Sequence, residues 1–324
     1  MGAVINSIGI YIPELKVGNK FFETLLDTSD EWIKCRTGIE QRYFAGEKEY
    51  TSDMCIKAAQ DLSVRYGKNL EDVDFIIVST MTPDQVVPNV ASRVQSALGI
   101  RSAGVVDISS ACSGFCYAVI LAQGLISSGL CRKVLVFGAD TMSRVLDFTD
   151  RNSCILFGDG AGAVLVEESD NNGLWHGVYG TDGTLGDNIY ITDKPKSISG
   201  KDVVPDGYFH QNGHNVYKWA LQVLSEQLVA LPAKNGLEVD EIDCFIPHSA
   251  NMRILESAFK TNRIPMDKCA ESLTKYATTS SASIPLAWDR ALKEGKISKG
   301  DILALFGFGG GLTYSGICLR NDIH

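Results

Sequence analysis

The chain has 324 residues, of which 45% are hydrophobic and 21% are charged. This composition excludes general disorder, and the length suggests about two domains or one large duplicated domain. The net charge of −9 argues against nonspecific nucleic-acid binding. No apolar run approaches the ~18 residues of a membrane-spanning helix, and the first residues lack the features of a secretory signal. The nine cysteines have no framework or metal-ligand spacing, so we expect free thiols, a cytoplasmic location, no membrane association and no metal.

The first third of the chain alternates between strand and helix patterns. Its turns and helix caps delimit five elements before residue 100. We expect a strand at 3–12, a capped helix starting at 28–33, a helix at 51–66, a strand at 74–79 and a helix at 89–98.

Cys112 lies on a sharp turn between a short buried strand at 105–108 and a helix running from 114 to 129. The unpaired N–H groups at the start of that helix favour a thiolate, so the sequence predicts a reactive cysteine. The alternative is a small core residue, as for most single cysteines in a cytosolic chain.

Later segments repeat the earlier ones in the same order, after a long surface loop expected at 182–206. The pairs are 51–66 with 216–230, 73–78 with 242–247, 134–138 with 303–307, and 160–166 with 313–319. Alternating strands and helices predict an α/β fold with mostly buried strands. We interpret the repeat as a duplication with halves at 1–170 and 171–324, although any two α/β stretches look somewhat alike.

Three further features fit acyl transfer through a thioester. His248 directly follows an apolar strand, at the strand end where α/β sheets place their chemistry. A run of hydroxyl residues at 278–283 leads into a helix, and three glycines at 309–311 follow another apolar strand. Their bare backbone N–H groups suit an anion. A cysteine, a histidine, hydroxyls and backbone donors together suit a covalent thioester mechanism.

Seven collinear motifs carry a resemblance to the β-ketoacyl-acyl-carrier-protein synthase III family, of the thiolase-like superfamily. They are Thr28–Ile33, Arg36–Ile39, the Cys112 turn, Thr149–Arg151, Phe157–Ala163, Pro247–Asn251 and Phe308–Thr313. The resemblance covers essentially the whole chain. It implies a duplicated α-β-α-β-α fold and a homodimer.

The resemblance also implies roles for single residues. Cys112 matches the acylated nucleophile, and His248 matches the histidine that donates to the extender's thioester oxygen. The N–H groups of Cys112 and Gly310 match the oxyanion hole. The matches to coenzyme A-binding positions are Thr28, Trp32, Arg36, Arg151 and Asn251. An indole face suits adenine, and guanidinium forks suit phosphate.

A basic patch for an acidic acyl carrier protein is expected at Lys218, Arg253, Lys260 and Arg263. For Lys260 and Arg263, ordinary solvated helix charge is an equal alternative. No cofactor is expected beyond acyl-coenzyme A as a substrate.

Two departures from the family pattern matter. Thr278 occupies the position of the family's second decarboxylation residue, an Asn in a Gly-Asn-Thr-Ser context, and His214 stands where Asn is common. The first reading is therefore a condensing enzyme that joins an acyl group to malonyl-carrier protein in fatty-acid or related biosynthesis. A second is a non-decarboxylating acyltransferase of specialised metabolism. A third, an acyl-binding scaffold, is disfavoured by the intact Cys112 and Gly310.

Overall fold

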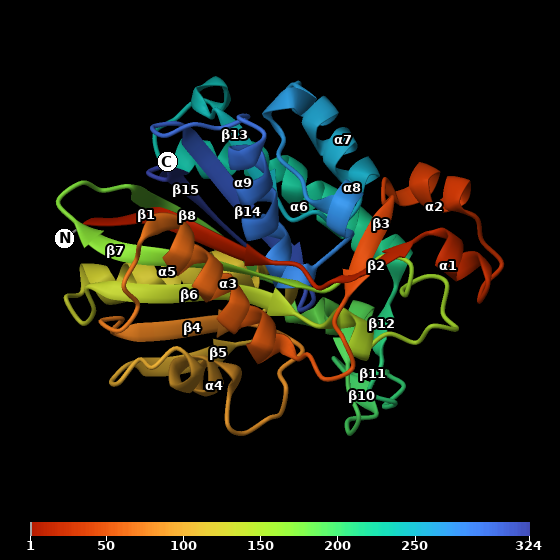
Figure 1. Ribbon diagram of the computed structural model, residues 1–324. Coiled ribbons are helices and arrows are strands. Elements are labelled where there is room, and N and C mark those ends of the chain that lie inside the picture. Colours follow the sequence, from red (N-terminus) through yellow and green to blue (C-terminus); the bar gives the residue numbers. More distant parts are fainter. Residues whose placement is uncertain (1) are drawn as a thin grey trace.

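The computed structural model describes residues 2–324, which form two β-sheets flanked and separated by helices (Figure 1). The first sheet has the strand order β1-β7-β6-β4-β5. Its strands are β1 (Gly2–Tyr11), β4 (Phe75–Ser79), β5 (Gly104–Ile108), β6 (Lys133–Asp140) and β7 (Gly160–Ser169). Strands β5, β4 and β6 are parallel, whereas β7 runs antiparallel to both β6 and β1.

The second sheet repeats this arrangement with four strands. They are β8 (Leu174–Thr181), β13 (Cys244–Pro247), β14 (Ile302–Gly309) and β15 (Thr313–Arg320). Read as β8-β15-β14-β13, the sheet has the same order and the same strand directions as β1-β7-β6-β4. The repeat found in the sequence therefore corresponds to a repeated topology.

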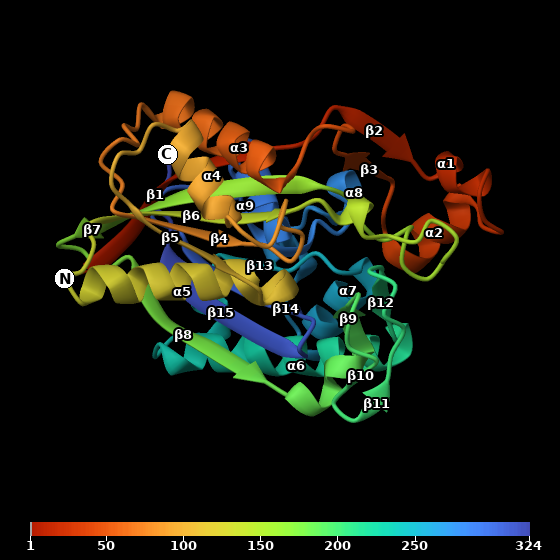
Figure 2. The same ribbon diagram turned by 90° about the horizontal axis from the view of Figure 1, so that it is seen from below.

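Helices form three layers around the two sheets (Figure 2). The six helices of these layers are α3 (Thr51–Tyr66), α4 (Val90–Ala97), α5 (Gly114–Ser127), α6 (Gly213–Lys234), α7 (Met252–Thr261) and α9 (Ser283–Lys293). Helices α3 and α4 cover the outer face of the first sheet, and α6 covers that of the second with α7 packed beside it. Helices α5 and α9 lie between the sheets and contact both. The predicted duplicated α-β-α-β-α fold is confirmed.

The central layer explains why α5 is largely apolar, because most of its surface packs against the two sheets. Leu121 and Gly124 lie on the one face of α5 that stays exposed. Phe115 on α5 and Trp288 on α9 are fully buried in the core between the sheets. Glycines permit the close approach of α9. A Cβ on Gly162 of β7 would lie 2.4 Å from the Cβ of Pro285 on α9.

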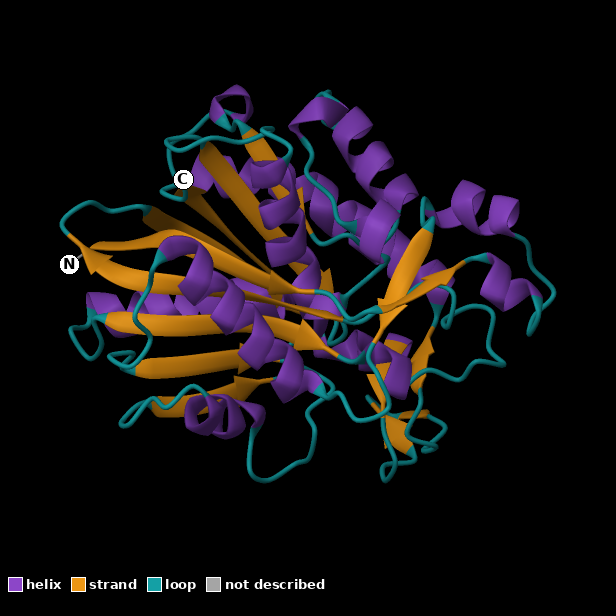
Figure 3. Cartoon of the chain, in the orientation of Figure 1, coloured by secondary structure: helices purple, strands orange, loops and turns teal. Residues whose placement is uncertain are grey.

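Smaller elements surround the ends of the strands (Figure 3). The short strands and helices are β2 (Leu15–Gly18), α1 (Lys20–Glu23), α2 (Asp30–Thr37), β3 (Gln41–Phe44), β9 (Ile189–Ile191), β10 (Ser197–Ile198), β11 (Lys201–Asp202), β12 (Phe209–Gln211) and α8 (Leu273–Tyr276). Single 3-10 turns are η1 (Ala111–Ser113), η2 (Met142–Arg144), η3 (Gly183–Asn188), η4 (Val239–Glu241), η5 (Met266–Lys268) and η6 (Ser280–Ala282).

The predicted elements agree with the structure at most positions. The helix at 51–66 matches α3, and the Ser29 hydroxyl caps α2 by accepting from the Trp32 N–H at 3.1 Å. The expected surface loop at 182–206 is wrong in part, because it contains η3, β9, β10 and β11. The helix expected at 216–230 begins three residues earlier, since the Asn212 side chain caps it. The boundary at residue 170 remains a prediction.

Gly162→Ala should lower the free energy of unfolding by about 1–3 kcal/mol, because the new methyl overlaps Pro285 in a packed layer. The matched control is Gly124→Ala on α5, where a Cβ meets nothing within 4 Å. That change should raise stability by roughly 0.5–1 kcal/mol through helix propensity. Denaturant unfolding followed by circular dichroism measures both. Equal effects of the two substitutions would contradict the packing.

Candidate active site

Cys112 is the middle residue of η1, the turn that joins β5 to α5. The preceding Ala111 has φ 44°, a left-handed conformation that makes this turn sharp. Cys112 also packs closely against the second half of the chain. A Cβ on Gly309 would be 3.1 Å from the Cβ of Cys112 and 3.3 Å from its Sγ. A side chain at position 309 would therefore displace the thiol or its backbone by a few tenths of an ångström.

The thiol is buried, with Cys112 9% exposed. Its Sγ lies 3.5 Å from the Oγ of Ser280 on η6. Burial raises the pKa of Cys112 to about 12. This differs from the sequence expectation of a thiolate: the helix N-terminus favours the anion, but removing the sulfur from water opposes it more strongly. The resting nucleophile is therefore a neutral thiol.

His248 follows β13 and is almost completely buried. Its backbone N–H donates to the carbonyl of Phe306 at 2.7 Å, and its ring lies edge-on to Phe308 with 5.3 Å between centroids. The ring Nδ1 lies 2.6 Å from the Oγ of Ser283. Burial lowers the pKa of His248 to about 3. The imidazole is therefore neutral near pH 7.

The four residues predicted for catalysis line one small cavity of about 70 Å³: Cys112, His248, Thr278 and Gly310. They come from four separate stretches of the chain, which the two halves bring together at the same ends of their sheets. The apolar walls are Met81, Leu156, Phe157, Ile189, Phe209 and Phe308. Such a largely apolar cavity strengthens any hydrogen bond made inside it.

The hydroxyl of Thr278 is not free to donate a hydrogen bond to a substrate in the cavity. Its hydroxyl donates to the carbonyl oxygens of Ser249 at 2.9 Å and Ala250 at 3.2 Å. A hydroxyl has one proton, so these carbonyls occupy it. The preceding Ala277 has φ 58° and ψ −159°, a conformation that otherwise belongs almost to glycine alone.

Three of the residues predicted to bind coenzyme A gather on the surface beside α2. The guanidinium carbons of Arg36 and Arg151 lie 5.9 and 5.1 Å from the ring centroid of Trp32. Arg151 also donates to the carbonyl of Asp27 at 2.6 Å. The hydroxyl of Thr28 is buried and has no hydrogen-bond partner among residues 2–324.

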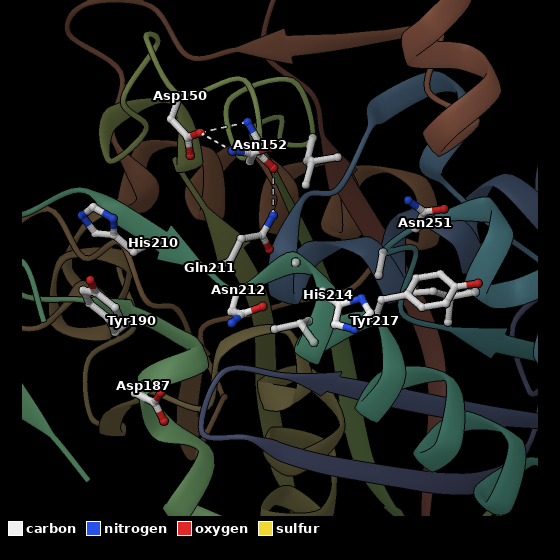
Figure 4. Close-up of a pocket in the computed structure, with 15 residues that line it drawn as sticks. Asp150, Asn152, Asp187, Tyr190, His210, Gln211, Asn212, His214, Tyr217 and Asn251 are labelled. Carbon is white, nitrogen blue, oxygen red and sulfur yellow. Dashed lines mark hydrogen bonds between the residues drawn. The ribbon is translucent and has the colours of Figure 1, made fainter. Parts of the chain in front are cut away.

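Asn251 links this surface to the inside of the protein. Its side-chain N–H donates to the Arg36 carbonyl at 3.2 Å, and its Oδ1 caps α7 through the Arg253 N–H at 2.9 Å. It lines a second cavity of about 710 Å³, as does His214 (Figure 4). The two cavities share five wall residues, Leu156, Gln211, Val216, Ala250 and Ile254. The larger cavity thus leads from the surface toward Cys112.

The four predicted carrier-docking residues are exposed and lie on or directly after α6 and α7, which pack against each other. None of them forms an ion pair within the described residues. Lys218 is on α6, Arg253 and Lys260 are on α7, and Arg263 follows α7 with φ 57°.

Two polar groups beside the site were not expected from the sequence. Asp140, at the end of β6, is fully buried. It accepts from the backbone and side-chain groups of two loops, the N–H of Met81, the hydroxyls of Thr80 and Thr82, and the N–H and hydroxyl of Ser281. Burial raises its pKa. The other is Ser283, which lay within the hydroxyl run noted above without a role. An aspartate ending an apolar strand was the available signal for Asp140.

Alkylation of Cys112 should speed up about tenfold per pH unit between pH 7 and 10 without a plateau, because its pKa of about 12 leaves thiolate scarce throughout. Iodoacetamide with peptide mass mapping measures this. Cys35 is exposed, so the experiment uses a Cys35→Ser background, and buried Cys116 should stay unmodified. A plateau below pH 8 would mean that the start of α5 outweighs burial.

Comparisons with known proteins agree with this geometry. A family model described as 3-oxoacyl-[acyl-carrier-protein] synthase III matches residues 106–183, and its C-terminal counterpart matches 233–321. The chain is 47% identical over 319 residues to β-ketoacyl-[acyl-carrier-protein] synthase III 2 of Halalkalibacterium halodurans, covering 98% of this chain and 96% of that one.

Two solved structures extend the similarity. The synthase III of Thermus thermophilus is 39% identical, with a TM-score of 0.94 and 99% of both chains covered. The priming β-ketosynthase of the R1128 polyketide pathway is 32% identical, with a TM-score of 0.92, covering 99% of this chain and 96% of that one. The chain therefore belongs to the β-ketoacyl-acyl-carrier-protein synthase III family of condensing acyltransferases, which have the thiolase-like fold.

Proposed function

We propose that this enzyme transfers an acyl group from coenzyme A to Cys112 and then condenses it with malonyl-acyl carrier protein. The observation that carries the proposal is the single buried cavity lined by Cys112, His248 and Gly310. A thiol nucleophile, a neutral imidazole and backbone N–H groups are the parts that thioester exchange requires.

In the first half-reaction, the Cys112 sulfur attacks the carbonyl carbon of the acyl thioester. The N–H groups of Cys112 and Gly310 stabilise the oxyanion. The N–H of Cys112 is free to do so because it lies in the 3-10 turn η1 at the start of a helix, where the first N–H groups have no partner within the turn. The bond to the coenzyme A sulfur then breaks. The thiol proton leaves with coenzyme A, so the neutral resting thiol is compatible with the exchange.

In the second half-reaction, the malonyl thioester loses carbon dioxide and becomes an enolate, with negative charge on its thioester oxygen. The enolate carbon attacks the carbonyl carbon of the acyl group on Cys112, and the thioester bond to the Cys112 sulfur breaks. The leaving thiolate then takes up one proton, which restores the neutral thiol. A neutral His248 with its proton on Nε2, the ring nitrogen that does not face Ser283, stabilises the enolate oxygen by donating a hydrogen bond. Removing one such donor commonly costs ~100- to 1000-fold in rate.

The hydroxyl of Thr278 favours a second candidate, a non-decarboxylating acyltransferase. Since that hydroxyl donates to two carbonyls, the enolate has one fewer donor than in a site with Asn. Acylation of Cys112 does not depend on this position. The relative from the R1128 polyketide pathway fits a role outside primary fatty-acid synthesis, so both functions are tested below.

The larger cavity fits the arm of coenzyme A, with the nucleotide at Trp32, Arg36 and Arg151 and with Asn251 along the route. Thr28, with its unbonded buried hydroxyl, adds a donor there. The unpaired cations of α6 and α7 fit an acidic carrier protein. They lie on or directly after the two helices whose Tyr217 and Ile254 line this cavity.

A homodimer in the cytoplasm completes the proposal. β5 lies at the edge of the first sheet. Its Val105, Val106 and Ile108 are only half-buried, and an apolar edge strand is a template for pairing with a second chain. In residues 2–324 none of the helices has the length and apolar composition needed to cross a bilayer.

Thr278→Asn should raise carbon dioxide release from malonyl-carrier protein about tenfold or more while leaving acylation of Cys112 unchanged. An amide has two donor hydrogens, so one can keep a backbone carbonyl while the other reaches the enolate. Intact mass after acyl-coenzyme A treatment follows acylation, and labelled malonyl-carrier protein follows carbon dioxide.

Thr278→Val is the matched control, since it removes the hydroxyl at similar volume. It should leave the low decarboxylation rate unchanged. A loss of decarboxylation in Thr278→Val would show that the Thr hydroxyl itself donates to substrate. Absence of acylation in the native enzyme would exclude both candidate functions, and acylation without carbon dioxide release would favour the second.

Arg36→Ala and Arg151→Ala should each raise the KM for acyl-coenzyme A about tenfold or more, the effect of losing one charged hydrogen bond. The limiting rate should change little, because these contacts act equally on ground and transition states. Arg132→Ala is the control. Arg132 is exposed, is paired with Glu168 and directly precedes β6, at the end of that strand away from the active site. An unchanged KM in both Arg36→Ala and Arg151→Ala would move the nucleotide site elsewhere.

A further inference from the structure

The side chain of His248 makes one hydrogen bond within the described chain, and both residues that form this bond are buried. The Nδ1 of the imidazole lies 2.6 Å from the Oγ of Ser283. His248 is 2% exposed and Ser283 is 0% exposed. The ring also lines the cavity at Cys112. With Nδ1 occupied by Ser283, Nε2 is the nitrogen left to meet a substrate.

The direction of this hydrogen bond decides what Nε2 can do. If Ser283 accepts, Nδ1 carries the proton and Nε2 has only a lone pair. If Ser283 donates, the proton of the neutral ring lies on Nε2. Among residues 2–324 the Ser283 hydroxyl has no other hydrogen-bond partner. An accepting Ser283 would leave its own proton buried and unbonded, which disfavours that arrangement about 10- to 100-fold.

The surrounding backbone keeps the two residues in register. The Ser272 hydroxyl donates to the Ser283 carbonyl at 3.1 Å, and the Ser272 N–H donates to the Ser249 hydroxyl at 3.0 Å. Ser272 thus joins the start of α9 to the residue that follows His248. Ser283 is also the first residue of α9, and the positive end of a helix disfavours an imidazolium next to it.

We propose that Ser283 is a positioning residue that holds His248 as the Nε2–H tautomer, so that the imidazole donates into the cavity and does not take the Cys112 proton. The proposal rests on the decarboxylating step proposed above. It matters more here than in a site with Asn, because the Thr278 hydroxyl is already occupied by carbonyls. His248 is then the side-chain donor on which the enolate depends.

Nitrogen NMR of histidine-labelled protein tests the tautomer directly, with His248→Asn to assign the signal. The native enzyme should show a protonated Nε2 and an accepting Nδ1. Ser283→Ala should lose this bias and release carbon dioxide from malonyl-carrier protein about 10- to 100-fold more slowly. Acylation of Cys112 by acyl-coenzyme A should stay unchanged. Ser283→Thr, which keeps the hydroxyl, should restore both the NMR signature and the rate.

Ser7→Ala is the matched control, since Ser7 is another fully buried serine, on β1, whose hydroxyl donates to Asn6. It should leave the tautomer and both half-reactions unchanged. A protonated Nδ1 in the native enzyme would overturn the proposal. Equal losses of acylation and decarboxylation in Ser283→Ala would also overturn it, since they indicate only damaged packing. If the native enzyme releases no carbon dioxide, the extender step of the proposed function fails, and the NMR signature still decides the tautomer.

Discussion

The site depends on one constraint: its polar groups lie where two helices begin, between two sheets and away from water. Helix α5 starts directly after η1, the turn that holds Cys112, and α9 starts at Ser283. Their leading turns, η1 and η6, occupy matching places in the two halves and touch each other. Desolvation makes each unpaired polar group there costly. This is why Asp140, without a cation, is surrounded by five hydrogen-bond donors from two loops.

The same burial determines the protonation states. Both groups that meet substrate are neutral, since burial raises the pKa of Cys112 to about 12 and lowers that of His248 to about 3. An ion pair between them would have to form in the same largely apolar cavity, where separating charge costs free energy. A neutral pair instead suits thioester exchange, in which charge develops on an oxygen facing fixed donors.

Much of the fold was predictable because its signals are local. Caps such as Ser29, turns and the periodicity of α3 fix element limits, and the repeated order of elements reveals the duplication. The Cys112, His248 and Gly310 motifs predicted one acyl-transfer chemistry, and the structure places the three residues around one cavity. The state of the thiol was not predictable, because it depends on how many atoms from distant segments surround it. The partners of Asp140 and Ser283 likewise come from loops far apart in sequence.

Thr278 and Ala277 are best understood as one change. Ala277 lies in a conformation that costs a residue with a Cβ about 1–3 kcal/mol relative to glycine. The Thr278 hydroxyl, bonded to the carbonyls of Ser249 and Ala250, ties this strained segment to the end of β13 and contributes about 0.5–1.5 kcal/mol. The tie offsets part of the strain. At this position the side chain therefore stabilises the backbone beside His248 and does not donate to the enolate. The imidazole of His248 is then the side chain that must supply the hydrogen bond to the enolate.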